Sequence, residues 1–246
     1  MATLVLVHGA WLGGWVWGRV AADLRARGHT VYAPTLTGLG ERRHLLAAVA
    51  DLETHATDLT NLLEFEDLQR ATLVAHGYAG AVAQRVAART PGRTARLAFL
   101  DAVVLADGET PLDALGPEAA AVLRARAAEE GGRAVYTPDA GLLLDGLPAR
   151  DADWVEDRLA PMPAAPYGRA VELGGFDELD LPTMFVKCLR GDPSAGRARA
   201  EAAGWVVYEI DGGHLPMIAR VEPTAELLDN FVRQPAARYT RAGRAP

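Results

Sequence analysis

Few side chains in this sequence could carry out acid–base or covalent chemistry. His214 follows the flexible pair Gly212-Gly213, and an unperturbed imidazole titrates near pH ~6.5, which suits proton transfer at neutral pH. Ser194 is the only serine, and a nucleophile there would need both geometry and a base beside it. Cys188, the only cysteine, is interpreted as a small buried hydrophobe. The residue types therefore favour proton transfer over covalent catalysis.

The elements that must position these residues alternate between strand and helix. Short apolar runs predict buried strands, and the helical spacing between them predicts covering helices. Repeated strand–helix–strand units imply right-handed crossovers and a parallel sheet covered on both faces. We therefore predict an α/β fold with a mostly parallel central sheet flanked by helices. The predicted strands are Thr3–Val7, His29–Ala33, Thr72–Ala75, Leu97–Leu100, Thr183–Val186 and Trp205–Ile210, and the predicted helices are Trp15–Arg27, Leu52–Glu64, Ala79–Thr90, Ala195–Ala203 and Pro223–Arg233.

One segment breaks this alternation. Residues 108–181 contain a predicted helix at Pro117–Glu129, several prolines and no convincing strand. We predict that this segment is a helical cap inserted above a core made of residues 1–107 and 182–234. Residues 235–246 are rich in Arg, Ala and Pro, and we predict a flexible tail there.

Composition limits the partners. The 246 residues carry a formal net charge of −7, and half of them are hydrophobic, which is ordinary for a globular enzyme. An acidic chain is a poor partner for nucleic acid or an anionic membrane, and no apolar run approaches the roughly 20 residues that span a bilayer. One cysteine excludes an internal disulfide and a cysteine-based metal cluster. We expect a cytoplasmic protein with a small-molecule substrate, no cofactor and no metal, and we leave a homodimer open.

Five segments together resemble one family. They are Val5–Trp11, Thr35–Arg42, Val74–Gly80, Arg158–Pro163 and Gly213–Met217. The chain resembles the α/β-hydrolase superfamily, and within it an actinobacterial esterase-like branch that is similar to plant hydroxynitrile lyases and methyl esterases. The resemblance runs from about residue 3 to residue 233 and implies an α/β-hydrolase fold. Function is not settled by a fold that hosts many chemistries.

The resemblance makes one position stand out. Val74-Ala75-His76-Gly77-Tyr78-Ala79-Gly80 has the strand–turn–helix context of the G-x-S-x-G nucleophile elbow, where the family has serine at the apex. Here the apex residue is Gly77, which has no oxygen to attack a carbonyl. Glycine adopts the strained torsions of such an apex without steric penalty. We predict that the serine is replaced by divergence and that space is freed above residue 77.

The oxyanion hole and the catalytic base of the family do not depend on the serine side chain. The resemblance implies an oxyanion hole made by the backbone N–H groups of Ala10 and Tyr78, and it places the catalytic base at His214. We expect Gly77, Trp11 and His76 to contact the substrate. The alternative for Trp11 and His76 is that their side chains only pack in the protein interior.

The acid that orients His214 is less clear. The family often has a carboxylate in a Cys-Thr-x-Asp pattern after the strand that ends near Lys187-Cys188. This chain reads Cys188-Leu189-Arg190-Gly191-Asp192, with the carboxylate one residue late. Asp192 is our first choice for the acid, although Arg190 could pair with it instead. Asp101 is the runner-up, because it ends a strand at the sheet edge where such folds have their sites.

A base and an anion hole without a nucleophile suit proton abstraction next to a carbonyl. We therefore predict a non-hydrolytic, cofactor-free tailoring enzyme that performs enolate-type chemistry: Michael or aldol-type addition or cyclisation, elimination, or isomerisation. The branch resemblance implies a polyketide-like or aromatic secondary metabolite as substrate. Two alternatives remain, a small-molecule-binding pseudohydrolase and a hydrolase that uses water activated by His214.

Overall fold

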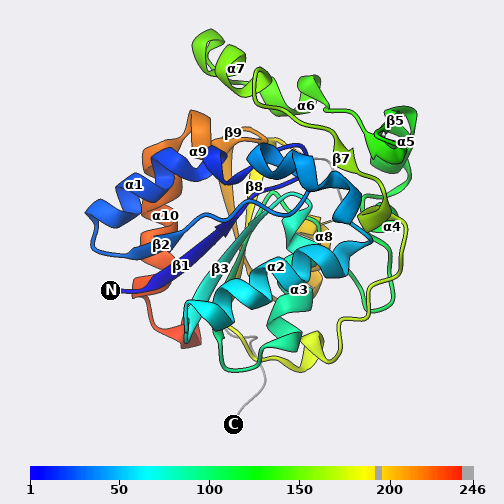
Figure 1. The fold of residues 1–246 in the computed structure, drawn as a ribbon. Helices are drawn as coiled ribbons and strands as arrows, with labels where there is room; N and C mark the ends of the chain where they lie inside the picture. Colours follow the sequence, from blue (N-terminus) through cyan, green and yellow to red (C-terminus); the bar gives the residue numbers. More distant parts are fainter. Residues whose placement is uncertain (192–195, 240–246) are drawn as a thin grey trace.

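A computed structural model describes residues 1–191 and 196–239 of the chain. Its centre is a six-stranded sheet in the order β2-β1-β3-β4-β8-β9, and every neighbouring pair in it is parallel. The predicted mostly parallel sheet is therefore confirmed (Figure 1). The strands are β1 Thr3–Val7, β2 Thr30–Tyr32, β3 Ala71–His76, β4 Thr94–Leu100, β8 Thr183–Arg190 and β9 Val206–Gly213.

The register of the inner strands brings their carboxyl ends together. Ala75 of β3 pairs with Val7 of β1 on one side and with Phe99 of β4 on the other. All six residues of β3 are buried, as expected of a strand covered on both faces. The residues that follow these strands must therefore meet at one edge of the sheet.

Helices cover both faces of the sheet. Helix α1 packs against α10, and α2 packs against α3; Figure 1 shows these two pairs on opposite sides of the strands. Most predicted helices agree with the observed ones to within a few residues. The helices and 3-10 turns of the core are η1 Gly14–Trp17, α1 Gly18–Ala26, η2 Gly40–Ala48, α2 Leu52–Phe65, α3 Ala79–Arg89, α8 Gly196–Ala202, α9 Pro216–Ala219, α10 Val221–Arg233 and η5 Ala236–Arg238.

The segment between β4 and β8 lies above the carboxyl edge of the sheet (Figure 1). It contains more than the predicted helices, because β5, β6 and β7 form an antiparallel sheet. Gly131 and Gly132 both have positive φ, +56° and +73°, which is the conformation of a two-residue hairpin turn. The segment consists of α4 Pro111–Ala114, α5 Pro117–Ala125, β5 Ala127–Glu130, β6 Arg133–Tyr136, α6 Ala140–Leu144, α7 Ala149–Glu156, β7 Met162–Pro163, η3 Ala165–Tyr167 and η4 Phe176–Glu178.

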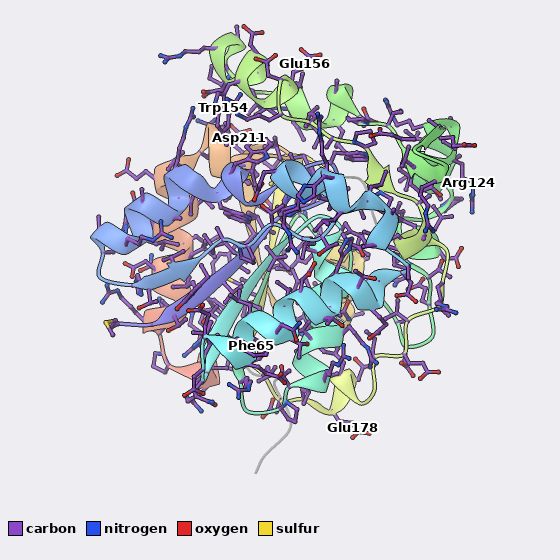
Figure 2. All side chains as sticks on the ribbon, viewed as in Figure 1. Phe65, Arg124, Trp154, Glu156, Glu178 and Asp211 are labelled. Carbon is purple, nitrogen blue, oxygen red and sulfur yellow. The ribbon has the colours of Figure 1, made fainter. Side chains whose placement is uncertain are left out.

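Helix α7 is tied to the core below it. The rings of Trp154 and Trp15 pack edge to face with centroids 5.1 Å apart, and Arg19 pairs with Asp151. Figure 2 shows Glu156 on the outer side of the same helix, where it is exposed. These contacts hold α7 against η1 and α1 of the core.

Residues 235–239 are the described part of the predicted tail 235–246, and they pack on the core; residues 240–246 lie outside the described residues. Tyr239 is buried, its ring packs edge to face on Phe231 with centroids 4.7 Å apart, and its hydroxyl lies 3.2 Å from that of Tyr208. Within residues 1–191 and 196–239, no helix is both long and apolar enough to cross a membrane.

Candidate active site

His214 and Asp101 meet at the carboxyl edge of the sheet. His214 directly follows β9, and Asp101 directly follows β4. The distance from Nδ1 of His214 to Oδ2 of Asp101 is 2.7 Å. Because an ionised carboxylate only accepts hydrogen bonds, Nδ1 of His214 carries the proton and Nε2 keeps a lone pair. In this tautomer Nε2 of His214 can accept a proton, and the role of His214 as a general base stays a prediction.

The carboxylate beside His214 is that of Asp101, the runner-up in the sequence analysis. Asp192, our first choice, lies outside the described residues. Asp101 is held in a left-handed backbone conformation with φ +45°, which is uncommon outside glycine but tolerated by aspartate. That backbone turn directs its side chain back toward β9.

Asp101 has a second cationic neighbour that the sequence analysis missed. Nζ of Lys187 lies 2.6 Å from Oδ1 of Asp101, and the N–H of Cys188 donates to the same oxygen at 3.3 Å. Burial alone would raise the pKa of Asp101, but the hydrogen bond from His214 and the charges of His214 and Lys187 hold that pKa below its ordinary value. The one available signal was the lone lysine of the sequence, which follows four buried residues of β8.

Gly77 lies opposite the free nitrogen of His214. A Cβ atom added at Gly77 would stand 3.3 Å from Nε2 of His214 and 3.5 Å from Cα of Gly9. The φ angle of Gly77 is +54°, a conformation that favours glycine. A side chain at position 77 would therefore point at the base, and with glycine that space belongs to the cavity.

Two backbone donors line the same cavity. Ala10 and Tyr78 are among its lining residues, and in the described part of the chain neither backbone N–H has a recorded hydrogen-bond partner. Helix α3 begins directly after Tyr78 and adds the positive end of its dipole. Both N–H groups are therefore available for the oxyanion hole that the family resemblance implies, and that role stays a prediction.

Hydrogen bonds to the carbonyl groups of Gly9 and Gly77 fix the peptide planes that contain these two donors. The carbonyl of Gly9, in one plane with the N–H of Ala10, accepts a hydrogen bond from Nδ1 of His8 at 2.8 Å. The carbonyl of Gly77, in one plane with the N–H of Tyr78, accepts from the N–H of Val103 at 2.9 Å. Since each plane is rigid, holding its oxygen also aims its N–H.

His8 is the buried histidine that anchors this loop. The N–H of Leu36 donates to its Nε2 at 3.1 Å, so the ring's proton is on Nδ1, which faces the Gly9 carbonyl. Burial lowers the pKa of His8 to about 4, partly offset by the hydrogen bond to Gly9. The imidazole is therefore neutral at neutral pH and holds one tautomer.

His76 does not contact the cavity, and the prediction that it would is wrong. It is fully buried, and its Nε2 donates to the backbone carbonyl of His214 at 2.8 Å. The two rings have centroids 4.3 Å apart. Burial, followed by the charge that His214 can carry, holds the pKa of His76 well below its ordinary value. His76 is the last residue of β3, so its side chain packs inside the core. There it contacts the backbone and ring of His214 on the side away from the cavity.

The phenol of Tyr78 also points away from the cavity's reacting end. Its hydroxyl lies 3.0 Å from Nδ1 of His55, whose Nε2 donates to the carbonyl of Thr37 at 2.9 Å. The phenol therefore donates to His55, and burial raises the pKa of Tyr78 well above its ordinary value. Tyr78 offers the reaction its backbone N–H and not its hydroxyl.

Trp11 joins the oxyanion loop to the overlying segment. Its indole N–H donates to the carbonyl of Tyr136 at 2.9 Å, and its own carbonyl accepts from the N–H of Ala160 at 3.0 Å. Its φ is +64°, which costs about 1–3 kcal/mol for a bulky residue. Trp11 lines the cavity, and its contact with a substrate stays a prediction.

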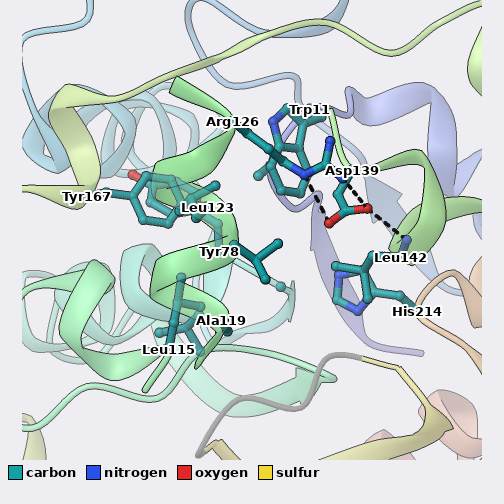
Figure 3. Close-up of a pocket in the computed structure, with 14 residues that line it drawn as sticks. Trp11, Tyr78, Leu115, Ala119, Leu123, Arg126, Asp139, Leu142, Tyr167 and His214 are labelled. Atoms are coloured by element: carbon teal, nitrogen blue, oxygen red, sulfur yellow. Dashed lines mark hydrogen bonds and ion pairs between the residues drawn. The ribbon is translucent and has the colours of Figure 1, made fainter. Parts of the chain in front are cut away.

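The cavity itself has a volume of about 250 Å³ and a mostly apolar wall (Figure 3). Its floor contains Gly77 and His214, and its cap side contains the pair Arg126 and Asp139. Across the described ranges, no group of three His, Cys, Asp or Glu residues is arranged to hold a metal ion. Besides Ala10, Trp11 and Tyr78, the lining contains Val103, Leu115, Ala119, Val122, Leu123, Leu142 and Tyr167.

Comparisons with known proteins agree with this arrangement. The family model described as the alpha/beta hydrolase family matches residues 4–227. A carbendazim hydrolyzing esterase of Nocardioides sp. (strain SG-4G) is 36% identical over 244 residues, which cover 93% of this chain and 98% of the esterase.

Solved structures show the same fold. An extracellular alpha/beta-hydrolase from a Paenibacillus species has a TM-score of 0.84 at 24% identity and covers 95% of this chain and 100% of its own. A pyrethroid hydrolase from Sphingobium faniae JZ-2 has a TM-score of 0.78 at 23% identity, with 96% of this chain and 99% of its own covered.

Proposed function

Since the chain belongs to the alpha/beta hydrolase family, we propose that it hydrolyses a small carboxylic ester with a water molecule that His214 activates. The observation that carries this proposal is the position of Nε2 of His214, which faces the space above Gly77 while Asp101 holds Nδ1. A water molecule in that space takes the place that a side-chain hydroxyl has in a serine hydrolase.

The reaction needs no covalent intermediate. Nε2 of His214 takes a proton from the water as the water's oxygen attacks the carbonyl carbon, and Asp101 stabilises the imidazolium that forms. The N–H groups of Ala10 and Tyr78 hold the developing oxyanion. When the tetrahedral intermediate collapses, the C–O bond to the alcohol breaks and His214 returns the proton to that oxygen. The products are a carboxylic acid and an alcohol.

The relatives support hydrolysis over the enolate chemistry predicted from the sequence. The Nocardioides relative is named an esterase, and its likeness extends over nearly the whole chain. The lyase and cyclase reactions find no such support, so the hydrolase alternative becomes the leading proposal.

A panel of 4-nitrophenyl and naphthyl esters of short acids tests the proposal. We expect steady turnover that falls by a factor of about 10²–10⁴ in His214→Ala, the range for loss of a general base. His44→Ala is a matched control, because His44 is exposed on η2 and lies outside the cavity lining. Equal turnover by the wild-type protein and His214→Ala would exclude His214 as the base.

Enolate chemistry stays a second candidate because the same base and donors suit it. Proton abstraction next to a carbonyl needs His214 and the oxyanion hole but no hydroxyl at position 77. Exchange of that carbon's hydrogen with solvent deuterium, lost in His214→Ala, is the expected signature. A pure binding protein would keep ligand affinity in His214→Ala and show neither ester turnover nor exchange.

A further inference from the structure

Arg126 and Asp139 interrupt an otherwise apolar cavity wall. Arg126 is the C-cap residue of α5 and Asp139 is the N-cap residue of α6, and both line the cavity. Figure 3 shows their side chains side by side on the cap side, between Trp11 and Leu142. Nothing in the hydrolytic mechanism uses this pair.

Arg126 and Asp139 pair with each other, but each can still form further hydrogen bonds. Nε of Arg126 donates to Oδ2 of Asp139 at 3.1 Å, Nη2 lies 2.9 Å from Oδ1, and Nη1 donates to the carbonyl of Pro138 at 2.8 Å. A guanidinium has five N–H donors, so two of them have no recorded partner in the described chain. Oδ1 also accepts the N–H of Leu142, which leaves Oδ2 with a single recorded donor.

The charges of the pair select what can bind there. The carboxylate of Asp139 neutralises the guanidinium in a site that is largely shielded from water, with side chains 16% and 32% exposed. An anionic group would lie against the Asp139 carboxylate, and an apolar group would leave polar atoms unpaired. A hydroxyl can accept from Arg126 and donate to Asp139 at once.

We propose that Arg126 and Asp139 form a specificity subsite that binds an uncharged hydroxyl group on an apolar carbonyl substrate. This rests on the proposed function in one respect, that the substrate's carbonyl lies at Ala10 and Tyr78. The substrate class is then a hydroxylated ester or ketone with an aromatic or similarly compact apolar body that fits about 250 Å³.

Unreactive ketones test the subsite without turnover. We would measure dissociation constants by calorimetry or ligand-observed NMR for acetophenone and 2-acetylnaphthalene, each unsubstituted and with a ring hydroxyl, methoxy or carboxylate group. The wild-type protein should bind the best hydroxylated compound of either series about tenfold more tightly than its parent, as expected for a hydrogen bond to a charged group. Carboxylated compounds should bind more weakly than the parents.

Three variants test whether the preference for hydroxylated ketones depends on Arg126 and Asp139. Arg126→Met should abolish the hydroxyl preference and leave the affinity for the parent ketone within about twofold. Asp139→Asn should reduce the preference while keeping the cap of α6, because asparagine is also a good N-cap residue. Arg124→Met is the matched control, since Arg124 is on the same helix, exposed and outside the cavity lining (Figure 2), and it should behave as wild type.

The outcomes separate this inference from the proposed function. A hydroxyl preference that is absent in the wild-type protein, or that persists in Arg126→Met, would overturn the subsite, as would preferred binding of the carboxylates or no binding at all. Ester turnover that depends on His214 would stand in each of those cases. A hydroxyl preference that depends on Arg126, without such turnover, would support the subsite and reject hydrolysis.

Discussion

Nε2 of His214 lies 3.3 Å from the point where a Cβ atom of residue 77 would stand. The base is thus aimed at a position that has no side chain. Asp101 holds the other ring nitrogen at 2.7 Å, so the proposed base, its proposed acid and the proposed backbone donors are arranged as a nucleophilic hydroxyl would require. Glycine at residue 77 supplies no hydroxyl group to this arrangement.

Gly77→Ser should supply that group. Its hydroxyl would lie within reach of Nε2 of His214, so we expect a burst of alcohol product and an acyl-enzyme that intact-protein mass spectrometry detects. The φ of +54° should cost about 1–2 kcal/mol of stability for a residue with a Cβ atom, measured by urea unfolding. Gly77→Ala has the same backbone cost without the oxygen and should show no burst. A burst in Gly77→Ala, or none in Gly77→Ser, would contradict the geometry.

Asp101→Asn should separate the two candidate acids. The amide cannot stabilise the imidazolium of His214, so kcat for ester hydrolysis should fall by a factor of about 10²–10⁴. Asp192→Asn, which changes our first choice from the sequence, should leave kcat within about threefold. The reverse pattern of the two kcat values would show that Asp192 is the acid during turnover.

His8→Ala should weaken the oxyanion hole without touching the substrate. The Gly9 carbonyl loses the donor that fixes its peptide plane, and with it the aim of the Ala10 N–H. Because the oxyanion develops only in the transition state, we expect kcat to fall about 10–100-fold with KM nearly unchanged. A raised KM at constant kcat would indicate a role in binding instead, and circular dichroism would establish that the variant is folded.

Stability should fall as the pH decreases from about 6.5 toward 4. Burial lowers the pKa values of His8, His55 and His76 in the folded protein. As the pH falls, these rings therefore become protonated at a higher pH in the unfolded protein than in the folded protein. Their stabilising contribution is therefore complete above the unfolded pKa and is lost below it. For His8, a shift from 6.5 to about 4 corresponds to about 3 kcal/mol.

Urea unfolding at pH 7, 6 and 5 measures this dependence. The free energy of unfolding should decrease toward pH 5, and the slope should become shallower in His8→Gln than in the exposed control His44→Gln. A free energy that is flat over this range would show that the pKa values of the three rings do not differ between the folded and unfolded protein.

The sheet and the position of His214 at its carboxyl edge were predictable because local patterns determine them. Buried apolar runs such as Thr3–Val7 indicate strands wherever they occur, and the motif around Gly213-His214 is contiguous. The partner of His214 was not predictable with the same certainty. Asp101 precedes His214 by 113 residues, and only the pairing of β4 with β8 and of β8 with β9 brings the two together.

Other misses have equally physical causes. Residues 127–130 are Ala-Ala-Glu-Glu, which have weak strand propensity, so the turn at Gly131-Gly132 and tertiary packing make the hairpin. His76 was expected in the cavity because it adjoins Gly77, yet the strand directs its ring behind His214. The proposed subsite of Arg126 and Asp139 has no contiguous motif, since the β5–β6 hairpin separates the two residues.

The central claim is that water, and not a protein side chain, attacks the carbonyl carbon. A quenched single turnover of a 4-nitrophenyl ester in H₂¹⁸O, with enzyme in excess, tests it most directly. We predict a carboxylic acid that carries one ¹⁸O atom and a protein mass that stays unchanged at every quench time, while Gly77→Ser gains the mass of the acyl group. An acyl group on the wild-type protein would contradict the account.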